Sequence, residues 1–245
     1  DYVIRNHGEF GRQDESYYVV VTGQDAVTYL GFENADSGDE FFEEAKKVEK
    51  SHEQMDYRKY VHAVKSIPGT QVMIPAGTIH ASGRNQVILE IGSLTVGSYT
   101  YKMYDYQRID PQTGSPRPIH LKMAEDVIHK ERDAKWVEDN LVNHGGVIRS
   151  GDGWCEKIVG EHALLYFSLR NLVLEREIED DTKGTFHVLS LVDGEKIKIE
   201  SLDHPQLHFE MKYLDIAVVP ADFGKYRIVN EGVGTVVVHK TLLKE

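Results

Sequence analysis

A histidine in this chain stands where its neighbours would hold its side chain still. His80 follows the turn at residues 75–78, Pro-Ala-Gly-Thr, and precedes the apolar run at residues 87–91. Proline presets φ and glycine accepts positive φ, so the tetrapeptide by itself indicates a turn. A rigidly held imidazole is what a metal site needs. Taken singly, a histidine after a turn is more often a hydrogen-bonded loop residue than a metal ligand.

Carboxylates at two further places could complete such chemistry. Glu15 comes just before the aromatic pair at residues 17–18, and Glu90 lies within the apolar run at residues 87–91. A glutamate can bind a divalent metal, and in a partly desolvated pocket it can act as a base near neutral pH. The alternatives are a solvated acid at Glu15 and a hydrogen-bonded acid inside a sheet at Glu90. The single cysteine, Cys155, excludes an intramolecular disulfide and a thiolate-rich zinc site.

The composition is that of an ordinary globular protein. The chain has 245 residues, 40% hydrophobic and 28% charged, enough for one large or two ordinary domains. A net charge of -12 argues against nucleic acid or an anionic membrane as a partner, although local Lys and Arg could still bind a phosphorylated substrate. No apolar run approaches the roughly 18 residues of a membrane helix, and no signal peptide is visible. We expect a cytoplasmic protein, because one cysteine also favours a reducing compartment.

Most of the sequence is predicted to form short strands separated by turns. In the first half, β-rich runs cover residues 17–21, 27–32, 71–74, 86–91 and 98–105. In the second half they cover residues 156–159, 164–169, 172–177, 186–192, 196–200, 216–219, 225–229 and 235–241. Many short strands with Gly or Asp-Gly turns are typical of sandwiches and jelly-roll barrels. The expected fold class is therefore all-β.

Two segments break the strand pattern. Residues 37–62 carry Phe41, Phe42, Ala45 and Val48 at helical spacing, which predicts a surface helix packed on a barrel. A shorter helix is predicted at residues 134–141. Its flanks and the Asn-His-Gly-Gly at residues 143–146 predict a boundary between one domain at residues 1–145 and another at residues 146–245.

The two predicted domains look like an imperfect repeat. Residues 69–77 and residues 215–222 each run from a strand through Pro-Ala into a turn. The first copy continues to His80, whereas the second continues through Phe-Gly-Lys-Tyr at residues 223–226 without a histidine. We expect one barrel with a metal site and a second barrel with a structural role.

Three segments of the first half of the chain together resemble the signature of a known protein family. Residues 74–81 (IPAGTIHA), 87–91 (VILEI) and 99–106 (YTYKMYDY) resemble, in that order, the signature of type I mannose-6-phosphate isomerases, zinc enzymes of the cupin superfamily. The resemblance is strong at residues 13–121 and general from residue 146 onward. It implies two jelly-roll (cupin) barrels with a helical insertion, and it implies interconversion of mannose 6-phosphate and fructose 6-phosphate.

The resemblance implies a zinc site to which this sequence contributes two ligands. Glu15 and His80 match the glutamate and histidine ligands of the family. The other two ligands come from a Gln-x-His-Pro motif upstream of the glutamate, which this sequence lacks. Residues 1–5 resemble the segment that follows the motif, so we expect the first barrel to be incomplete at its N-terminus. Two ligands would give a weak site, because zinc normally takes three or four protein groups.

The resemblance also implies roles for three further residues. Glu90 matches a glutamate near the metal and is expected to assist proton transfer. Lys102 stands where bacterial members carry an arginine, so it supplies the substrate with a point charge in place of a bidentate fork. Arg108 is a secondary candidate for binding phosphate, as is Arg117, and each could equally be a solvated loop charge.

Two functions from different classes follow from these residues. The first is a metal-dependent aldose-ketose isomerase that acts on mannose 6-phosphate or a related sugar, possessing one divalent metal ion, zinc. The alternative is a non-catalytic, sugar-binding or regulatory cupin, which the missing motif and Lys102 would favour. In both cases the expected partner is a small sugar or sugar phosphate.

Overall fold

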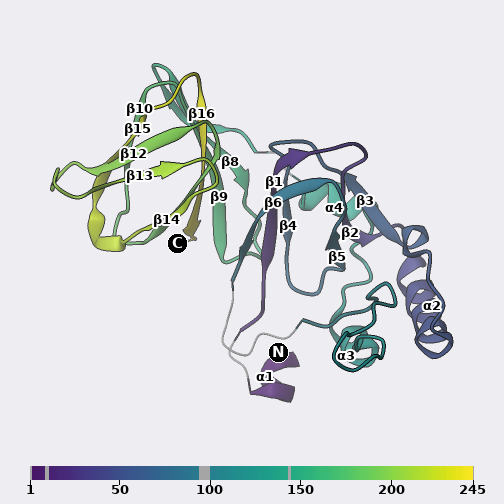
Figure 1. The fold of residues 1–245 in the computed structure, drawn as a ribbon. Coiled ribbons are helices and arrows are strands. Elements are labelled where there is room, and N and C mark those ends of the chain that lie inside the picture. Colours follow the sequence, from purple (N-terminus) through teal and green to yellow (C-terminus); the bar gives the residue numbers. More distant parts are fainter. Residues whose placement is uncertain (1, 9–10, 94–99, 143–144, 245) are drawn as a thin grey trace. The chain divides into compact units, whose positions relative to one another are not determined.

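Two compact units make up the chain. The computed structural model describes residues 2–8, 11–93, 100–142 and 145–244 (Figure 1). The first unit consists of residues 1–70 and 74–142, and the second of residues 71–73 and 143–245. Each unit is built on a pair of β-sheets. None of the described helices is long and apolar enough to cross a membrane.

Strands of the first unit take part in two three-stranded sheets, in the orders β4-β1-β6 and β3-β2-β5; of the strand β4, only Ile74 belongs to the first unit. Tyr17 of β1 lies opposite Glu90 of β6, and Leu30 of β2 lies opposite His80 of β5. Because side chains alternate along a strand, Glu15 shares one face of its sheet with Tyr17 and Glu90. The strands are β1 (Glu15–Thr22), β2 (Val27–Phe32), β3 (Val61–Lys65), β4 (Gln71–Ile74), β5 (His80–Ser82) and β6 (Gln86–Gly92).

The helical insertion in the first unit is shorter than predicted. Helix α2 covers Ser37–Ser51 and ends at His52, whose backbone is left-handed with φ 60°. The N–H of His52 donates to the carbonyl of Val48 at 2.8 Å, which closes the last turn. The chain then forms a 3-10 turn, η1 (Tyr57–Lys59), and enters β3. The prediction of a helical segment to residue 62 is therefore wrong beyond this cap.

The apolar stripe of α2 explains its position. Phe41, Phe42, Ala45 and Val48 are buried on one face of the helix, in a cluster that includes Phe32 of β2. The other helices of the unit are α1 (Tyr2–His7), α3 (Leu121–Val127) and α4 (Ala134–Asn140). The last of these confirms the short helix predicted near residue 134.

The second unit is a sandwich of a four-stranded sheet, β10-β15-β12-β13, and a six-stranded sheet, β14-β11-β16-β9-β8-β7. Its core is a cluster of aliphatic side chains contributed by both sheets, with the fully buried Tyr226 among them. The strands are β7 (Val147–Gly151), β8 (Trp154–Gly160), β9 (Phe167–Leu174), β10 (Glu177–Asp181), β11 (His187–Asp193), β12 (Lys196–Ser201), β13 (His208–Lys212), β14 (Ile216–Val219), β15 (Lys225–Asn230) and β16 (Val236–Leu243), with a 3-10 turn, η2 (Ala221–Phe223), between β14 and β15.

The expected fold class, all-β with a helical insertion, is confirmed. Two strand predictions need correction. Residues 164–169 and 172–177 contribute to a single strand, β9. The run at residues 98–105 lies partly outside the described residues, and residues 100–105 are not a strand. There the N–H of Lys102 donates to His120 Nδ1 at 3.2 Å, and its carbonyl accepts the N–H of His120 at 2.7 Å, so these groups pair with one loop residue in place of a strand.

Candidate active site

The turn before His80 is built around one glycine. Gly77 has φ +81°, a left-handed conformation that glycine adopts without strain. A Cβ at this position would lie 2.6 Å from the ring of His129 and 2.7 Å from the carbonyl oxygen of Val127. Both backbone conformation and space therefore require glycine, and the turn enters β5 in a fixed direction.

Two buried charged side chains hold the same turn from either side. The carboxylate of Asp14, which is fully buried, accepts the N–H of Ala76 at 2.9 Å. Arg132 Nη1 donates to the carbonyl oxygens of Pro75 and Ala76 at 3.1 and 3.0 Å, and to Thr78 Oγ1 at 2.5 Å. Hydrogen bonds to charged groups are among the stronger ones in proteins. No sequence pattern indicated this support, because the two side chains come from segments far apart in the chain.

His80 is held at both ring nitrogens. Its Nδ1 lies 2.9 Å from the carbonyl oxygen of Thr78, and its Nε2 lies 3.1 Å from Glu15 Oε2. A carbonyl oxygen can only accept a hydrogen bond, so Nδ1 carries a hydrogen and Nε2 is the nitrogen that faces Glu15. Gln13 Nε2 donates to the other oxygen of Glu15 at 2.6 Å. The two predicted ligands therefore meet, although 65 residues separate them in the sequence.

The contact shifts both groups toward their charged forms. The hydrogen bond from His80 lowers the pKa of Glu15, against an opposing effect of burial. Burial acts to lower the pKa of His80, but its hydrogen bonds to Glu15 and Thr78 outweigh burial and raise it. The pair therefore holds a proton between His80 Nε2 and Glu15 Oε2, and a cation bound by these two atoms would take the place of that proton.

Two further side chains belong to the cluster: Tyr17, on the same strand β1 as Glu15, and Glu90, on the paired strand β6. Partial burial of its carboxylate and the charge of Glu15 raise the pKa of Glu90, while His80 opposes the shift. Glu90 as a whole residue is exposed, so solvent and small molecules can reach it. The ring of Tyr17 meets the ring of His80 edge-on, with centroids 6.0 Å apart. Tyr17 was not predicted as a site residue, although its position two residues after Glu15 on a strand was a usable signal.

The structure does not bring all of the predicted residues together. Lys102 Nζ lies 3.8 Å from Asp105 Oδ2, an oxygen that also forms an ion pair with Arg117 Nε at 3.2 Å. Within the described residues, Lys102 has no hydrogen bond or ion pair with Glu15 or His80. The predicted role of Lys102, to supply positive charge to a substrate at Glu15 and His80, stays a prediction.

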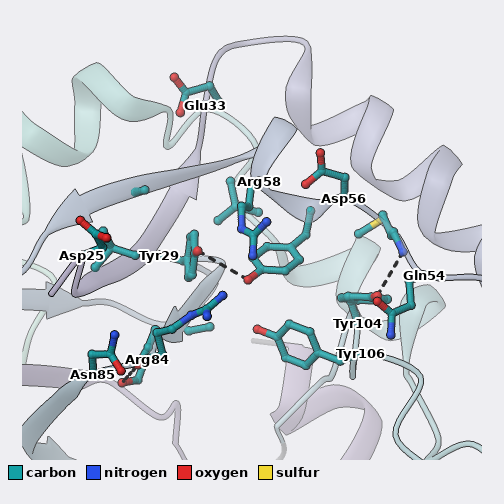
Figure 2. A pocket seen from close by; sticks show the side chains of 18 of the residues that line it. Asp25, Tyr29, Glu33, Gln54, Asp56, Arg58, Arg84, Asn85, Tyr104 and Tyr106 are labelled. Atoms are coloured by element: carbon teal, nitrogen blue, oxygen red, sulfur yellow. Dashed lines mark hydrogen bonds between the residues drawn. The ribbon is translucent and has the colours of Figure 1, made fainter. Parts of the chain in front are cut away.

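Arg108 belongs to a different place in the first unit. Its guanidinium carbon lies 5.3 Å from the centroid of the Tyr106 ring, and it lines a cleft of about 1420 Å³. Ala81 also lines this cleft. Successive residues of a strand point to opposite faces, so the neighbouring His80 points away from it. Figure 2 shows the cleft, with Tyr29, Arg58, Arg84 and Tyr106 around its middle.

The donor types at Glu15 and His80 fit zinc, but the number of donors does not complete a site. Carboxylate oxygen and imidazole nitrogen are zinc ligands, and a histidine ligand usually donates its other N–H to an acceptor, as His80 does to Thr78. Among the described residues, no group of three or more His, Cys, Asp or Glu side chains could hold a metal ion. The pair offers part of a ligand set.

Solved structures show which proteins share this fold. The chain is similar to the mannose 6-phosphate isomerase from Bacillus subtilis, with 23% identity, a TM-score of 0.73, and 97% of this chain and 68% of that chain covered. It is also similar to a putative mannosephosphate isomerase from Archaeoglobus fulgidus, with 15% identity, a TM-score of 0.68, and coverage of 100% and 66%.

A phosphomannose isomerase variant from Salmonella typhimurium gives 12% identity, a TM-score of 0.61, and coverage of 95% and 68%. A mannose 6-phosphate isomerase bound with zinc and yttrium gives 12% identity, a TM-score of 0.55, and coverage of 95% and 67%. No family model and no curated protein matches the sequence. The chain thus spans about two thirds of the length of its structural neighbours, and at these identities the likeness establishes a shared fold.

Proposed function

We propose that the first unit carries an aldose-ketose isomerase site that interconverts mannose 6-phosphate and fructose 6-phosphate. The observation that carries the proposal is the 3.1 Å contact between Glu15 and His80, made by side chains from two different sheets. Its context supports the proposal, because Glu90 lies beside the pair and the fold is shared with proteins that have this activity in their names.

Glu15 and His80 would hold a zinc ion in this site, through Oε2 and Nε2. Bound zinc supplies a Lewis acid that orients and polarises the oxygens of the sugar. Gln13 would keep the Glu15 carboxylate in place through its 2.6 Å hydrogen bond, and the Thr78 carbonyl would fix the tautomer and the direction of the His80 ring.

Glu90 would move the proton in the reaction. Isomerisation between C1 and C2 of a sugar removes a proton from one carbon and returns a proton to its neighbour, through a cis-enediol. A base for this step must be ionised, yet basic enough to accept the proton. Partial burial and the charge of Glu15 raise the pKa of Glu90, which makes its carboxylate a stronger base than an ordinary glutamate. Because Glu90 is exposed, a substrate can reach it. Lys102 would supply positive charge to the sugar oxygens or the phosphate.

Metal content tests the ligand assignment directly. We expect the wild-type chain, dialysed to equilibrium against a series of free zinc concentrations, to bind one zinc ion per chain saturably but weakly, as measured by elemental analysis. Glu15→Gln and His80→Gln should each lose most of this zinc, because two donors hold it and each change removes one. His62→Gln is the matched control, since His62 also contacts two glutamates, Glu33 and Glu138, at 3.4 and 3.0 Å. Equal zinc in all four proteins would refute the assignment.

A second candidate function is a sugar-binding cupin without catalysis. One observation favours it: within the described part of the chain, the candidate metal site has fewer than three acidic or histidine donors. This function predicts that mannose 6-phosphate binds while fructose 6-phosphate is not formed, with or without added zinc. A coupled assay for fructose 6-phosphate therefore separates the two candidates, provided that binding is measured on the same protein.

A further inference from the structure

We propose that the cleft shown in Figure 2 is a second ligand site, separate from the Glu15–His80 cluster, for a compound that combines a hydroxyl-bearing ring with phosphate. The shared chemistry fits a sugar phosphate or a nucleotide. The proposal does not depend on the isomerase function, since Glu15, His80 and Glu90 are not among the residues that line the cleft.

The position of the cleft follows from strand alternation. Val27 and Tyr29 of β2, Ala63 of β3 and Ala81 of β5 line the cleft. Their side chains therefore lie on one face of the β3-β2-β5 sheet, and the alternate residue His80 lies on the other. One sheet thus separates the two sites, and a ligand in the cleft would not contact the Glu15–His80 pair.

Three arginines line the cleft without carboxylate partners. Within the described residues, Arg58, Arg84 and Arg108 form no ion pair with an acidic side chain. The chain has a net charge of -12, and acids are available to pair with arginines elsewhere. Elsewhere in the described part of the chain, arginines do pair with carboxylates, among them Arg12, Arg117, Arg149, Arg170, Arg176 and Arg227. The Arg58 guanidinium hydrogen-bonds to Tyr29 and Tyr57, but none of the three has a described carboxylate to neutralise its charge. Such guanidinium groups, gathered at one cleft, give an acidic protein a local site that can attract an anion.

Four tyrosines provide the surface on which a ring can stack. The ring centroids of Tyr29 and Tyr57 are 5.1 Å apart, those of Tyr57 and Tyr106 are 5.3 Å apart, and those of Tyr104 and Tyr106 are 5.3 Å apart. Arg58 lies over the Tyr57 ring at 5.5 Å and Arg108 over the Tyr106 ring at 5.3 Å. A flat or pyranose ring against the tyrosines would place its phosphate within reach of these guanidinium groups.

Acidic side chains at the cleft narrow the class of ligand. Asp25, Glu33 and Asp56 line the same space and are exposed. Their oxygens can accept hydrogen bonds from the hydroxyls of a sugar or a ribose, and their charge disfavours a bare polyanion. The volume of about 1420 Å³ exceeds the roughly 300–1000 Å³ typical of small-molecule pockets, so a ring with one or two phosphates fits inside it.

Side-chain NMR of arginine locates the binding. We would label the chain with ¹⁵N-arginine, assign the Nε–Hε signals of the cleft by substitution, and titrate with mannose 6-phosphate, adenosine 5′-diphosphate, inorganic phosphate and mannose. Saturable shifts at Arg84 and Arg108 are expected with mannose 6-phosphate or adenosine 5′-diphosphate. Whichever of the two binds more tightly tells whether the cleft prefers a sugar phosphate or a nucleotide. Inorganic phosphate and mannose should each bind at least about tenfold more weakly, because each lacks half of the recognised chemistry.

Substitutions then test the role of the guanidinium groups. Arg84→Gln and Arg108→Gln should each weaken binding about tenfold or more, the scale of one charge-assisted contact. Arg176→Gln removes the same charge from an exposed arginine of the second unit and should leave the affinity unchanged. Glu15→Gln should also leave it unchanged, which separates this site from the isomerase proposal. No saturable shift with either ring phosphate, equal affinity for inorganic phosphate, or full binding by both cleft variants would overturn the inference.

Discussion

At the scale of single residues, the direction of the His80 ring decides what the candidate site can do. Its Nδ1 is committed to a backbone carbonyl, which leaves Nε2 for Glu15 or for a cation. Glu15 is oriented in turn by Gln13. Each proposed ligand side chain is therefore oriented through its atom remote from the metal, Nδ1 of His80 and Oε1 of Glu15, which leaves Nε2 and Oε2 to face a cation.

The role of Glu90 makes a prediction at the same scale. Glu90→Gln removes the base but keeps the shape of the side chain, so we expect kcat for mannose 6-phosphate to fall by about 10²-fold or more. KM and bound zinc should change little, because Glu90 is not a proposed metal ligand. Steady-state kinetics with a coupled assay measures the loss. Glu40→Gln, a change at an exposed glutamate of α2, is the control and should retain full activity. A Glu90→Gln protein as active as this control would exclude Glu90 as the base.

At the scale of elements, the turn at residues 75–78 places His80. Its glycine, its buried aspartate contact and its three arginine hydrogen bonds are all local to the entry of β5. The loop from residue 100 to residue 105 serves the opposite face of the unit, because Tyr104 accepts the N–H of Met55 at 3.1 Å through its hydroxyl and lines the cleft. Strand β5 therefore contributes His80 to the proposed metal site and Ala81 to the proposed ligand cleft.

The turn predicts a specific pattern of stability. Gly77→Ala should lower the free energy of unfolding by clearly more than 1 kcal/mol, roughly 2–4 kcal/mol, because it adds backbone strain and a clash with His129 and Val127. Gly69→Ala is a matched control, with φ +88° and nothing within 4 Å of the added carbon, so it reports the strain without the clash. Urea unfolding of both variants measures the difference. Equal losses would mean that the packing around Gly77 contributes nothing.

At the scale of the whole molecule, the second unit has its own source of stability. Besides its apolar core, it buries an ionic network in which Glu156 Oε1 lies 2.8 Å from Lys240 Nζ, and Lys240 Nζ lies 2.5 Å from Asp180 Oδ2. Arg149 also pairs with Glu156, and Arg170 Nη1 lies 3.3 Å from it. Removing one member of this network would leave an opposite charge buried without its partner, which is strongly destabilising.

This network predicts a defined sensitivity to acid. Burial alone would raise the pKa of Glu156, but Lys240 and then Arg149 outweigh it and hold the pKa at about 2, below the unfolded value of 4.5. The resulting stabilisation, roughly 3 kcal/mol, is fully present above pH 4.5 and is lost as the pH falls toward 2.

Urea unfolding at a series of pH values from 7 down to 2 tests this linkage. Glu156→Gln should be less stable than wild type at pH 7, and the difference should shrink between pH 4.5 and 2. Glu210→Gln, at an exposed pair with Lys196, should follow the wild-type curve closely. A constant difference between wild type and Glu156→Gln across this range would contradict the assignment.

The sequence by itself determined the all-β class, most strand positions and the turn before His80, because these depend on alternation, on Gly and Pro, and on neighbours a few residues away. It also indicated Glu15 and His80 as partners, through a resemblance to known zinc enzymes. Tertiary structure decided the rest. Contacts between side chains of two different sheets bring Glu15 to His80, and the register of β1 with β6 places Tyr17 opposite Glu90. Tertiary structure also decides that the turn is held by Asp14 and Arg132 and that Arg108 faces a different cleft. Such pairings join residues far apart in the chain, so no local pattern can specify them.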